Sequence, residues 1–258
     1  MHISIAAEPL FHIWGLTVTN SLLASFVTTI FLTVFAIFMS LNIKSVPTRI
    51  QAVVEEFFMF IMDLTEKSID AKFTKKFVPL VITLFFFILM SNWLGLLPGF
   101  GSLILEKVED GHQEFVPLLR GATADLNTTL ALALISFFAI QFFGIAQSKL
   151  SYFKKFINFT TPINFFVGVL ELISEVAKII SFSFRLFGNV FAGEVLLAVI
   201  ISLVPLLAPL PFFGLEVFIG FIQALVFAML TLIFIQLAMS HHVEAAGEVG
   251  AKDRIKSH

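Results

Sequence analysis

Long uncharged stretches constrain the fold of this chain more than any other feature. The segment from Gly15 to Ile43 contains no charged residue, and two further apolar segments cover 77–97 and 126–147. A helix that crosses a lipid bilayer needs about 20 mostly apolar residues, so each segment predicts a membrane-spanning helix. With 58% hydrophobic and only 13% charged residues, the composition favours an integral membrane protein over a soluble one.

The last apolar run, from 164 to 240, is long enough for two helices. Three prolines interrupt it, Pro205, Pro209 and Pro211, and they predict a short turn between helices over 164–204 and 212–240. The first of these helices would be about 60 Å long at a rise of about 1.5 Å per residue. That is twice a hydrocarbon core of roughly 30 Å. Because no proline or paired glycine breaks the helix, we expect a strongly tilted hairpin.

The segment 47–70 has a different pattern. Apolar residues recur there at helical spacing, namely Ile50, Val53, Val54, Phe57, Phe58, Ile61 and Leu64. Polar residues occupy the positions between them, including Gln51, Glu55, Glu56, Asp63 and Glu66. This pattern predicts an amphipathic helix that lies in the membrane interface. A small soluble helix packed on a partner is the alternative.

Basic residues are distributed unevenly between the connecting segments. The segment 44–76 holds six, 149–155 holds three and the C-terminal tail holds three, whereas 98–120 holds two beside four acidic residues. The positive-inside rule therefore predicts an outer N-terminus over 1–14 and a cytoplasmic C-terminus, which agrees with five crossings. The other connections are an outer loop over 98–125, a cytoplasmic loop over 148–163 and a cytoplasmic tail over 241–258.

Several ionisable residues fall inside the predicted last two spans. They are Glu171, Glu175, Lys178, Arg185, Glu194 and Glu216. A charge at mid-bilayer costs at least about 2.5–3.5 kcal/mol, so such residues usually face water or a partner. For Lys178, neutralisation by Glu175 and Glu171 on the same helix face is an equally good explanation.

Arg185 is the hardest of these charges to explain by pairing within its own helix. No acidic residue lies three or four positions away on either side, and a guanidinium stays protonated in proteins. Asn189 extends the same polar face, with the small residues Gly188 and Ala192 nearby. We therefore expect a carboxylate from elsewhere, supplied by Glu194, by Glu216 or by another protein.

The fifth span carries a sparse polar stripe. Glu216, Gly220, Gln223 and Phe227 share one helix face. A carboxylate in this position would be neutral or ionised according to its access to water, which is the property a proton relay requires.

Several motifs together resemble subunit a of F-type ATP synthases. The segment Ser181–Glu194, with its Arg-Leu-Phe-Gly-Asn core, carries the strongest resemblance. Asn92 to Pro98, Ala124 to Thr129, Glu171 to Ser174 and the pair Gln223-Ala224 match further motifs in order. The resemblance covers nearly the whole chain.

This resemblance implies a bacterial plasma-membrane subunit whose tilted hairpin packs against a rotor ring of subunit c. The implied partners also include the peripheral-stalk subunit b and the rest of the ATP synthase. Arg185 would be the fixed cation that the ring carboxylates pass. The outer half-channel would be lined by Asn92, Asp125, Asn127, Glu194, Glu216 and Gln223. Glu171 and Ser174 would belong to the cytoplasmic half-channel, and Lys178 and Asn189 are further candidates for the proton pathway.

The chain departs from the family pattern at two places. Relatives commonly have a His at one of the positions of Glu194 and Glu216, whereas this chain has Glu at both, so at least one is expected to hold a proton. Gly95 stands where some relatives have an acid, which removes one group from the side where ions enter. The choice between H⁺ and Na⁺ stays open.

No catalysis, cofactor or metal is expected in this chain itself. Nucleotide binding is not expected because the sequence contains no phosphate-binding loop. Two other classes of function are alternatives. One is a self-contained ion-coupled secondary transporter, which the absence of an internal repeat disfavours. The other is a purely structural subunit, which leaves Arg185 unexplained.

Overall fold

Helices form almost all of the ordered structure in the computed structural model. The described residues are 7–13, 16–66, 71–97, 100, 104–109, 112–148, 152, 162–204 and 207–255. Within these residues, five helices are long and apolar enough to cross a membrane: α1 (Asn20–Leu41), α3 (Ala71–Leu96), α4 (Leu126–Ser148), α5 (Pro162–Leu203) and α6 (Pro209–Ile255). A sixth, α2 (Arg49–Glu66), covers the predicted amphipathic segment. The predicted all-α membrane fold is therefore confirmed.

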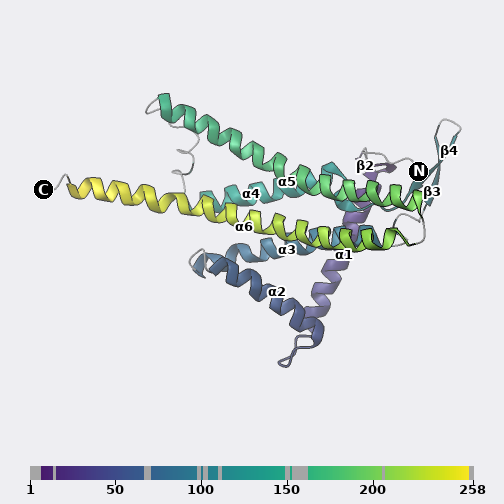
Figure 1. The fold of residues 1–258 in the computed structure, drawn as a ribbon. Coiled ribbons are helices and arrows are strands. Elements are labelled where there is room, and N and C mark those ends of the chain that lie inside the picture. The colour runs from purple at the N-terminus through teal and green to yellow at the C-terminus, as the bar shows by residue number, and fades with distance from the viewer. Residues whose placement is uncertain are drawn as a thin grey trace.

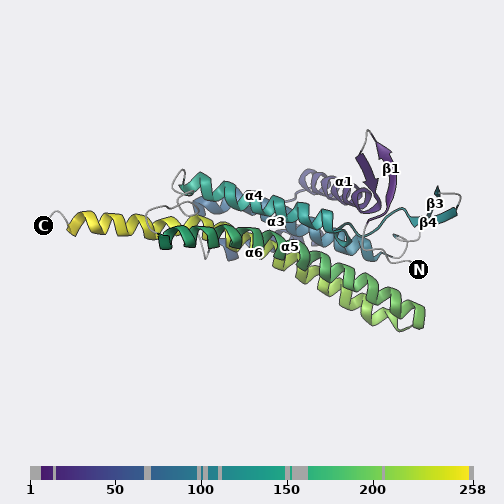
Figure 2. The same ribbon diagram turned by 90° about the horizontal axis from the view of Figure 1, so that it is seen from above.

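The core is built by α3, α4, α5 and α6. The most extensive packing is between α3 and α6, and α4 contacts both α5 and α6 (Figure 2). Apolar contacts dominate, as where the ring centroid of Phe182 on α5 lies 5.0 Å from that of Phe227 on α6. One buried polar link joins α4 to α6, with the hydroxyls of Ser136 and Thr231 2.7 Å apart. Hydroxyl pairs of this kind hold helices together where water is absent.

Helix α1 stands at the edge of this bundle. Its buried residues all lie in its first three turns, Asn20, Ser21, Ala24 and Thr28, and beyond them the helix leans away from α3 and α6 (Figure 1). Helix α2 then returns to the bundle, where Phe57 stacks on Phe85 of α3 with the ring centroids 4.2 Å apart. Such an aromatic pair contributes about 0.5–1.5 kcal/mol beyond its buried area.

Helices α5 and α6 form the predicted long hairpin. Helix α5 is unbroken over 42 residues, or about 63 Å at 1.5 Å per residue, so it cannot stand upright in a single bilayer. Helix α6 begins at Pro209 rather than at the predicted Phe212. Pro209 and Pro211 fit the first turn because the N–H groups there have no partner within the helix. The helical conformation also continues to Ile255, past the expected end at Ser240.

Two β-hairpins were not predicted from the sequence. Strands β1 (Pro9–Ile13) and β2 (Leu16–Thr19) pair in antiparallel fashion, as do β3 (Ile104–Glu109) and β4 (His112–Pro117). The first span, expected from Gly15, therefore begins only at Asn20, where the Thr19 hydroxyl accepts a hydrogen bond from the backbone N–H of Leu22. A 3₁₀-helix, η1 (Ala122–Ala124), precedes α4.

Both hairpins lie at the same end of the molecule as the α5–α6 turn (Figure 1). We call this end the hairpin end. Of the predicted loop over 148–163, all but 148, 152, 162 and 163 lies outside the described residues, as do 1–6 and 14 of the predicted N-terminal segment.

Candidate functional site

Arg185 lies midway along α5 with its side chain exposed. Its Nη2 donates a hydrogen bond to the Ser181 hydroxyl at 3.0 Å, and Asn189 donates to the Arg185 backbone carbonyl at 3.0 Å. Among the residues that the structure describes, no carboxylate lies within 4.0 Å of the guanidinium. The chain thus presents an uncompensated permanent cation on the exposed face of α5.

Arg185 is the centre of a strip of small side chains on α5. The other members are Ser174, Ala177, Ser181, Gly188 and Ala192, all of them exposed. Their spacing of three or four residues puts them on a single helix face, and a Cβ added to Gly188 would meet no atom within 4 Å. We call this surface the small-residue strip. Small residues allow another helix to approach the backbone closely.

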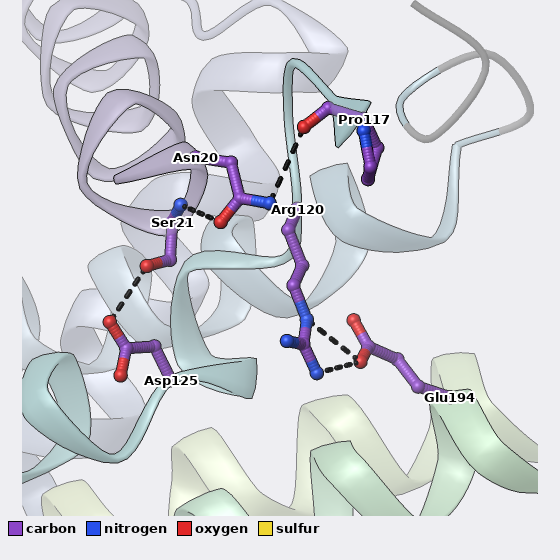
Figure 3. A network of polar contacts seen from close by, with 6 residues as sticks. All are labelled: Asn20, Ser21, Pro117, Arg120, Asp125 and Glu194. Atoms are coloured by element: carbon purple, nitrogen blue, oxygen red, sulfur yellow. Dashed lines mark hydrogen bonds and ion pairs between the residues drawn. The ribbon is translucent and has the colours of Figure 1, made fainter. Parts of the chain in front are cut away.

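Glu194 lies on the opposite side of α5 from Arg185. The two residues are nine positions apart, or two and a half turns at about 3.6 residues per turn. Glu194 pairs instead with Arg120, whose Nε and Nη2 donate to the same carboxylate oxygen, Oε2, at 3.2 and 2.9 Å (Figure 3). The expectation that Glu194 could serve as the partner of Arg185 is therefore not met.

Glu216 on α6 is buried against α5. Its carboxyl group occupies the space above Gly193 that a Cβ would need, so only glycine at 193 permits this approach. Glu216 is 7% exposed, and within the described part of the chain it makes no side-chain hydrogen bond and no ion pair. Glu216 and Glu194, although both are carboxylates of the same hairpin, thus have different surroundings.

Asn92 joins three elements at the hairpin end. Its amide nitrogen donates to the backbone carbonyl of Gly220 on α6 at 3.0 Å, and its oxygen accepts from the Thr123 hydroxyl of η1 at 2.6 Å. Gly220 allows this contact because a Cβ there would lie 3.1 Å from the Asn92 Cβ. The next residue, Trp93, donates from its indole to the Val217 carbonyl.

Asp125 is almost fully buried between η1 and α4. One of its oxygens accepts from the Ser21 hydroxyl of α1 at 2.7 Å, and the other accepts from the backbone and side-chain nitrogens of Asn127. Figure 3 shows the Ser21 hydroxyl of α1 directed at the Asp125 carboxylate. Asp125 therefore holds the start of α4 and the start of α1 together.

The predicted outer residues come together at the hairpin end. Asn92, Asp125, Asn127, Glu194 and Glu216 are linked through η1, the segment before it and the α5–α6 contact. Gln223 lies on α6, one turn beyond Gly220; it is partly buried and makes no hydrogen bond within the described residues. We call this group the outer cluster.

Three predicted residues, Glu171, Ser174 and Lys178, lie on α5 between its N-terminus and Arg185. Lys178 pairs with Glu175 at 3.0 Å and lies 4.8 Å from the Phe234 ring centroid. Gln141 of α4 donates to Glu175 and accepts from the Tyr152 hydroxyl. These contacts favour neutralisation of Lys178 by its own helix.

Glu171 and Ser174 lie on α5 before this group. Glu171 is partly exposed and has a partner, whereas Ser174 is exposed on the small-residue strip. The structure does not bring either residue near the outer cluster. The two sets of polar residues therefore lie on either side of Arg185 along α5.

Arg120 was missed as a functional candidate from the sequence. In the sequence it is one of two basic residues in an acidic loop, and nothing in the local sequence marks it as a partner of Glu194. The only available signal was its position, four residues before the Ala124–Thr129 motif.

A family model for the ATP synthase A chain matches residues 22–236, which include every predicted site residue. The chain belongs to this family. The resemblance read from the sequence motifs is thereby confirmed. As an A-chain family member, it is a multi-pass, channel-type membrane subunit that takes part in proton translocation in the membrane sector of ATP synthase. Membership also implies that it works with the rest of that complex, which decides against a self-contained secondary transporter.

Proposed function

We propose that this chain is the static subunit that presents Arg185 to the carboxylates of a rotor ring and supplies the two half-channels that lead to it. The observation that carries the proposal is Arg185 itself, a permanent cation on an exposed face with no carboxylate partner among the described residues. An unpaired charge in a membrane span is costly, so a carboxylate from another subunit is its natural partner.

The small-residue strip supports a moving partner rather than a fixed one. Arg185 is the only large side chain on it, so a neighbouring helix can slide past a smooth surface that carries a single charge. A ring carboxylate that reaches Arg185 would have to be ionised to pair with it. The same cation would stop protons from passing directly between the two half-channels.

The division of polar residues along α5 supports two separate half-channels. The outer cluster lies toward the hairpin end from Arg185, and Glu171 with Ser174 lies toward the other end. Lys178 and Asn189 flank the strip, with Asn189 donating to the Arg185 carbonyl. A proton would enter on one side, travel with the ring and leave on the other. Movement of one charge through 100 mV releases about 2.3 kcal/mol, which is available to turn the ring.

We further propose that the hairpin end faces outward from a bacterial plasma membrane and that the other end faces the cytoplasm. The distribution of basic residues in the sequence supports this orientation. The proposed partners are the ring of subunit c at the small-residue strip and the peripheral-stalk subunit b elsewhere on the chain.

Site-directed photocrosslinking tests the ring contact. The chain contains no cysteine, so Gly188→Cys gives one attachment point on the strip for a maleimide–benzophenone reagent. In the intact complex we expect light-dependent crosslinking to the ring subunit. Ser183→Cys is the matched control, because Ser183 is fully buried against Thr129 of α4. The proposal fails if Gly188→Cys gives no ring product, or no more than Ser183→Cys.

A further inference from the structure

Arg120 is held against α5 although it belongs to none of the motifs. Its two hydrogen bonds to Glu194 are joined by a contact with Phe191, one turn earlier on α5, whose ring centroid lies 6.0 Å from the guanidinium carbon. The Arg120 side chain is only 12% exposed. The cation is therefore largely buried, and it is fixed to α5, the helix that carries Glu194.

The backbone on both sides of Arg120 is anchored. Before it, the Pro117 carbonyl accepts a hydrogen bond from the Asn20 side chain at 3.3 Å, as Figure 3 shows. After it, Gly121 packs directly on Gly95 of α3, where a Cβ on Gly95 would lie 2.9 Å from the Gly121 Cα. A segment held at both ends leaves Arg120 little freedom to move away from Glu194.

The two oxygens of Glu194 are not equivalent. Oε2 accepts both hydrogen bonds from Arg120, whereas Oε1 accepts none within the described residues. Oε1 lies beside Gly121, 3.7 Å from where a Cβ on that residue would be. Both oxygens of an ionised carboxylate can accept, so Oε1 keeps capacity for an ion or a water molecule.

We propose that Arg120 is a positioning residue of the outer half-channel, which holds Glu194 by Oε2 and leaves Oε1 to receive the incoming ion. Glu194 is then a fixed anion near the outer end of the path. Glu216, which has no such cation within the described residues, is the carboxylate that passes the proton toward the ring. This assignment rests on the proposed function, because it adds a residue to the same path.

Proton pumping by the intact ATP synthase in membrane vesicles tests this role. The variants are Arg120→Gln, Arg120→Lys, Glu194→Gln and the double variant Arg120→Gln/Glu194→Gln. A reacting group displaced by about 1 Å can cost up to about 100-fold in rate, so we expect Arg120→Gln to lower pumping by about tenfold or more. Arg120→Lys should restore part of the loss, because it keeps a cation near Oε2.

The double variant separates positioning from a general effect on folding. If Arg120 acts through Glu194, the double variant pumps no less than Glu194→Gln alone. If Arg120→Gln alone fails to assemble, the unpaired Glu194 is the cause, and the double variant must assemble. Normal pumping in Arg120→Gln overturns the proposal, as do fully additive losses or failure of both variants to assemble.

A matched control and a second site complete the design. Arg49→Gln removes an exposed arginine of α2 that lies outside the site, and it should pump as the unaltered chain does. Arg185→Ala in parallel distinguishes the two proposals. If Arg185→Ala loses coupling while Arg120→Gln does not, the role of Arg120 fails and the proposed function stands.

Discussion

At the scale of single residues, the two carboxylates of the α5–α6 hairpin have different neighbours. Glu194 pairs with Arg120, whereas Glu216 lies against the bare backbone of Gly193. Arg120 supplies a counter-charge to Glu194, whereas Glu216 has no such cation within the described residues.

Gly193→Ala tests the contact between Gly193 and Glu216. The added methyl group would occupy the position of the Glu216 carboxyl, so either the side chain must rotate or the helices must separate. Because the clash is with the end of a flexible side chain that can rotate, the overpacking cost of about 1–3 kcal/mol is an upper limit. We expect lower thermal stability of the complex together with reduced proton pumping.

Gly214→Ala is the matched control for this change. It is an exposed position on α6 where a Cβ would meet nothing within 4 Å. Equal stability and equal pumping in Gly193→Ala and Gly214→Ala would contradict the account of Glu216.

At the scale of elements, the outer cluster depends on how closely the segment before η1 approaches α3. The contact of Gly95 with Gly121 is between backbones, so neither residue can relieve a clash by changing a rotamer. A larger side chain at position 95 would not fit this arrangement. The close approach of Gly95 therefore helps to place the segment that carries Arg120.

Gly95→Ala tests this dependence. The new Cβ would lie 2.9 Å from the Gly121 Cα, which forces the segment carrying Arg120 to shift. We expect pumping to fall, though by less than in Arg120→Gln, because the guanidinium is still present. Pumping assays of both variants in the same vesicles make the comparison. If Gly95→Ala lowers pumping by the same factor in the Glu194→Gln variant, the shift acts through residues other than Glu194.

The sequence predicted the helices well because their signals are local. Runs of about 20 apolar residues and the prolines near 205–211 mark the spans directly. The two β-hairpins were missed because each strand is only four to six residues long and gives a weak periodic signal. The start of the first span was misplaced for the same reason, since residues 16–19 are apolar enough to extend a helix but pair with β1.

The candidate site was predictable only where motifs carried it. The pairing of Arg120 with Glu194 joins residues 74 positions apart, and no local pattern encodes such a contact. The same is true of Asp125 with Ser21, which are 104 positions apart. By contrast, the pairing of Lys178 with Glu175 follows from their separation of three residues on one helix.

At the scale of the whole molecule, α5 separates two chemically different sides. One side carries Arg185 on an exposed strip of small residues, and the other holds Glu194 against the bundle. Because nine residues amount to a half-integral number of helical turns, the geometry of the helix keeps the cation and the anion apart. A partner at the strip would therefore meet Arg185 before it met any carboxylate of the outer cluster.

The most direct test of this account is proton flux through the complex with Arg185→Ala, reconstituted in liposomes. ATP-driven pumping and passive flux under an imposed potential would be measured on the same preparation. Since Arg185 is proposed to separate the two half-channels, we expect pumping to fall by at least about tenfold with the complex assembled, and passive flux to rise. Normal coupled pumping without Arg185 would contradict the central claim and would leave the arginine a purely structural role.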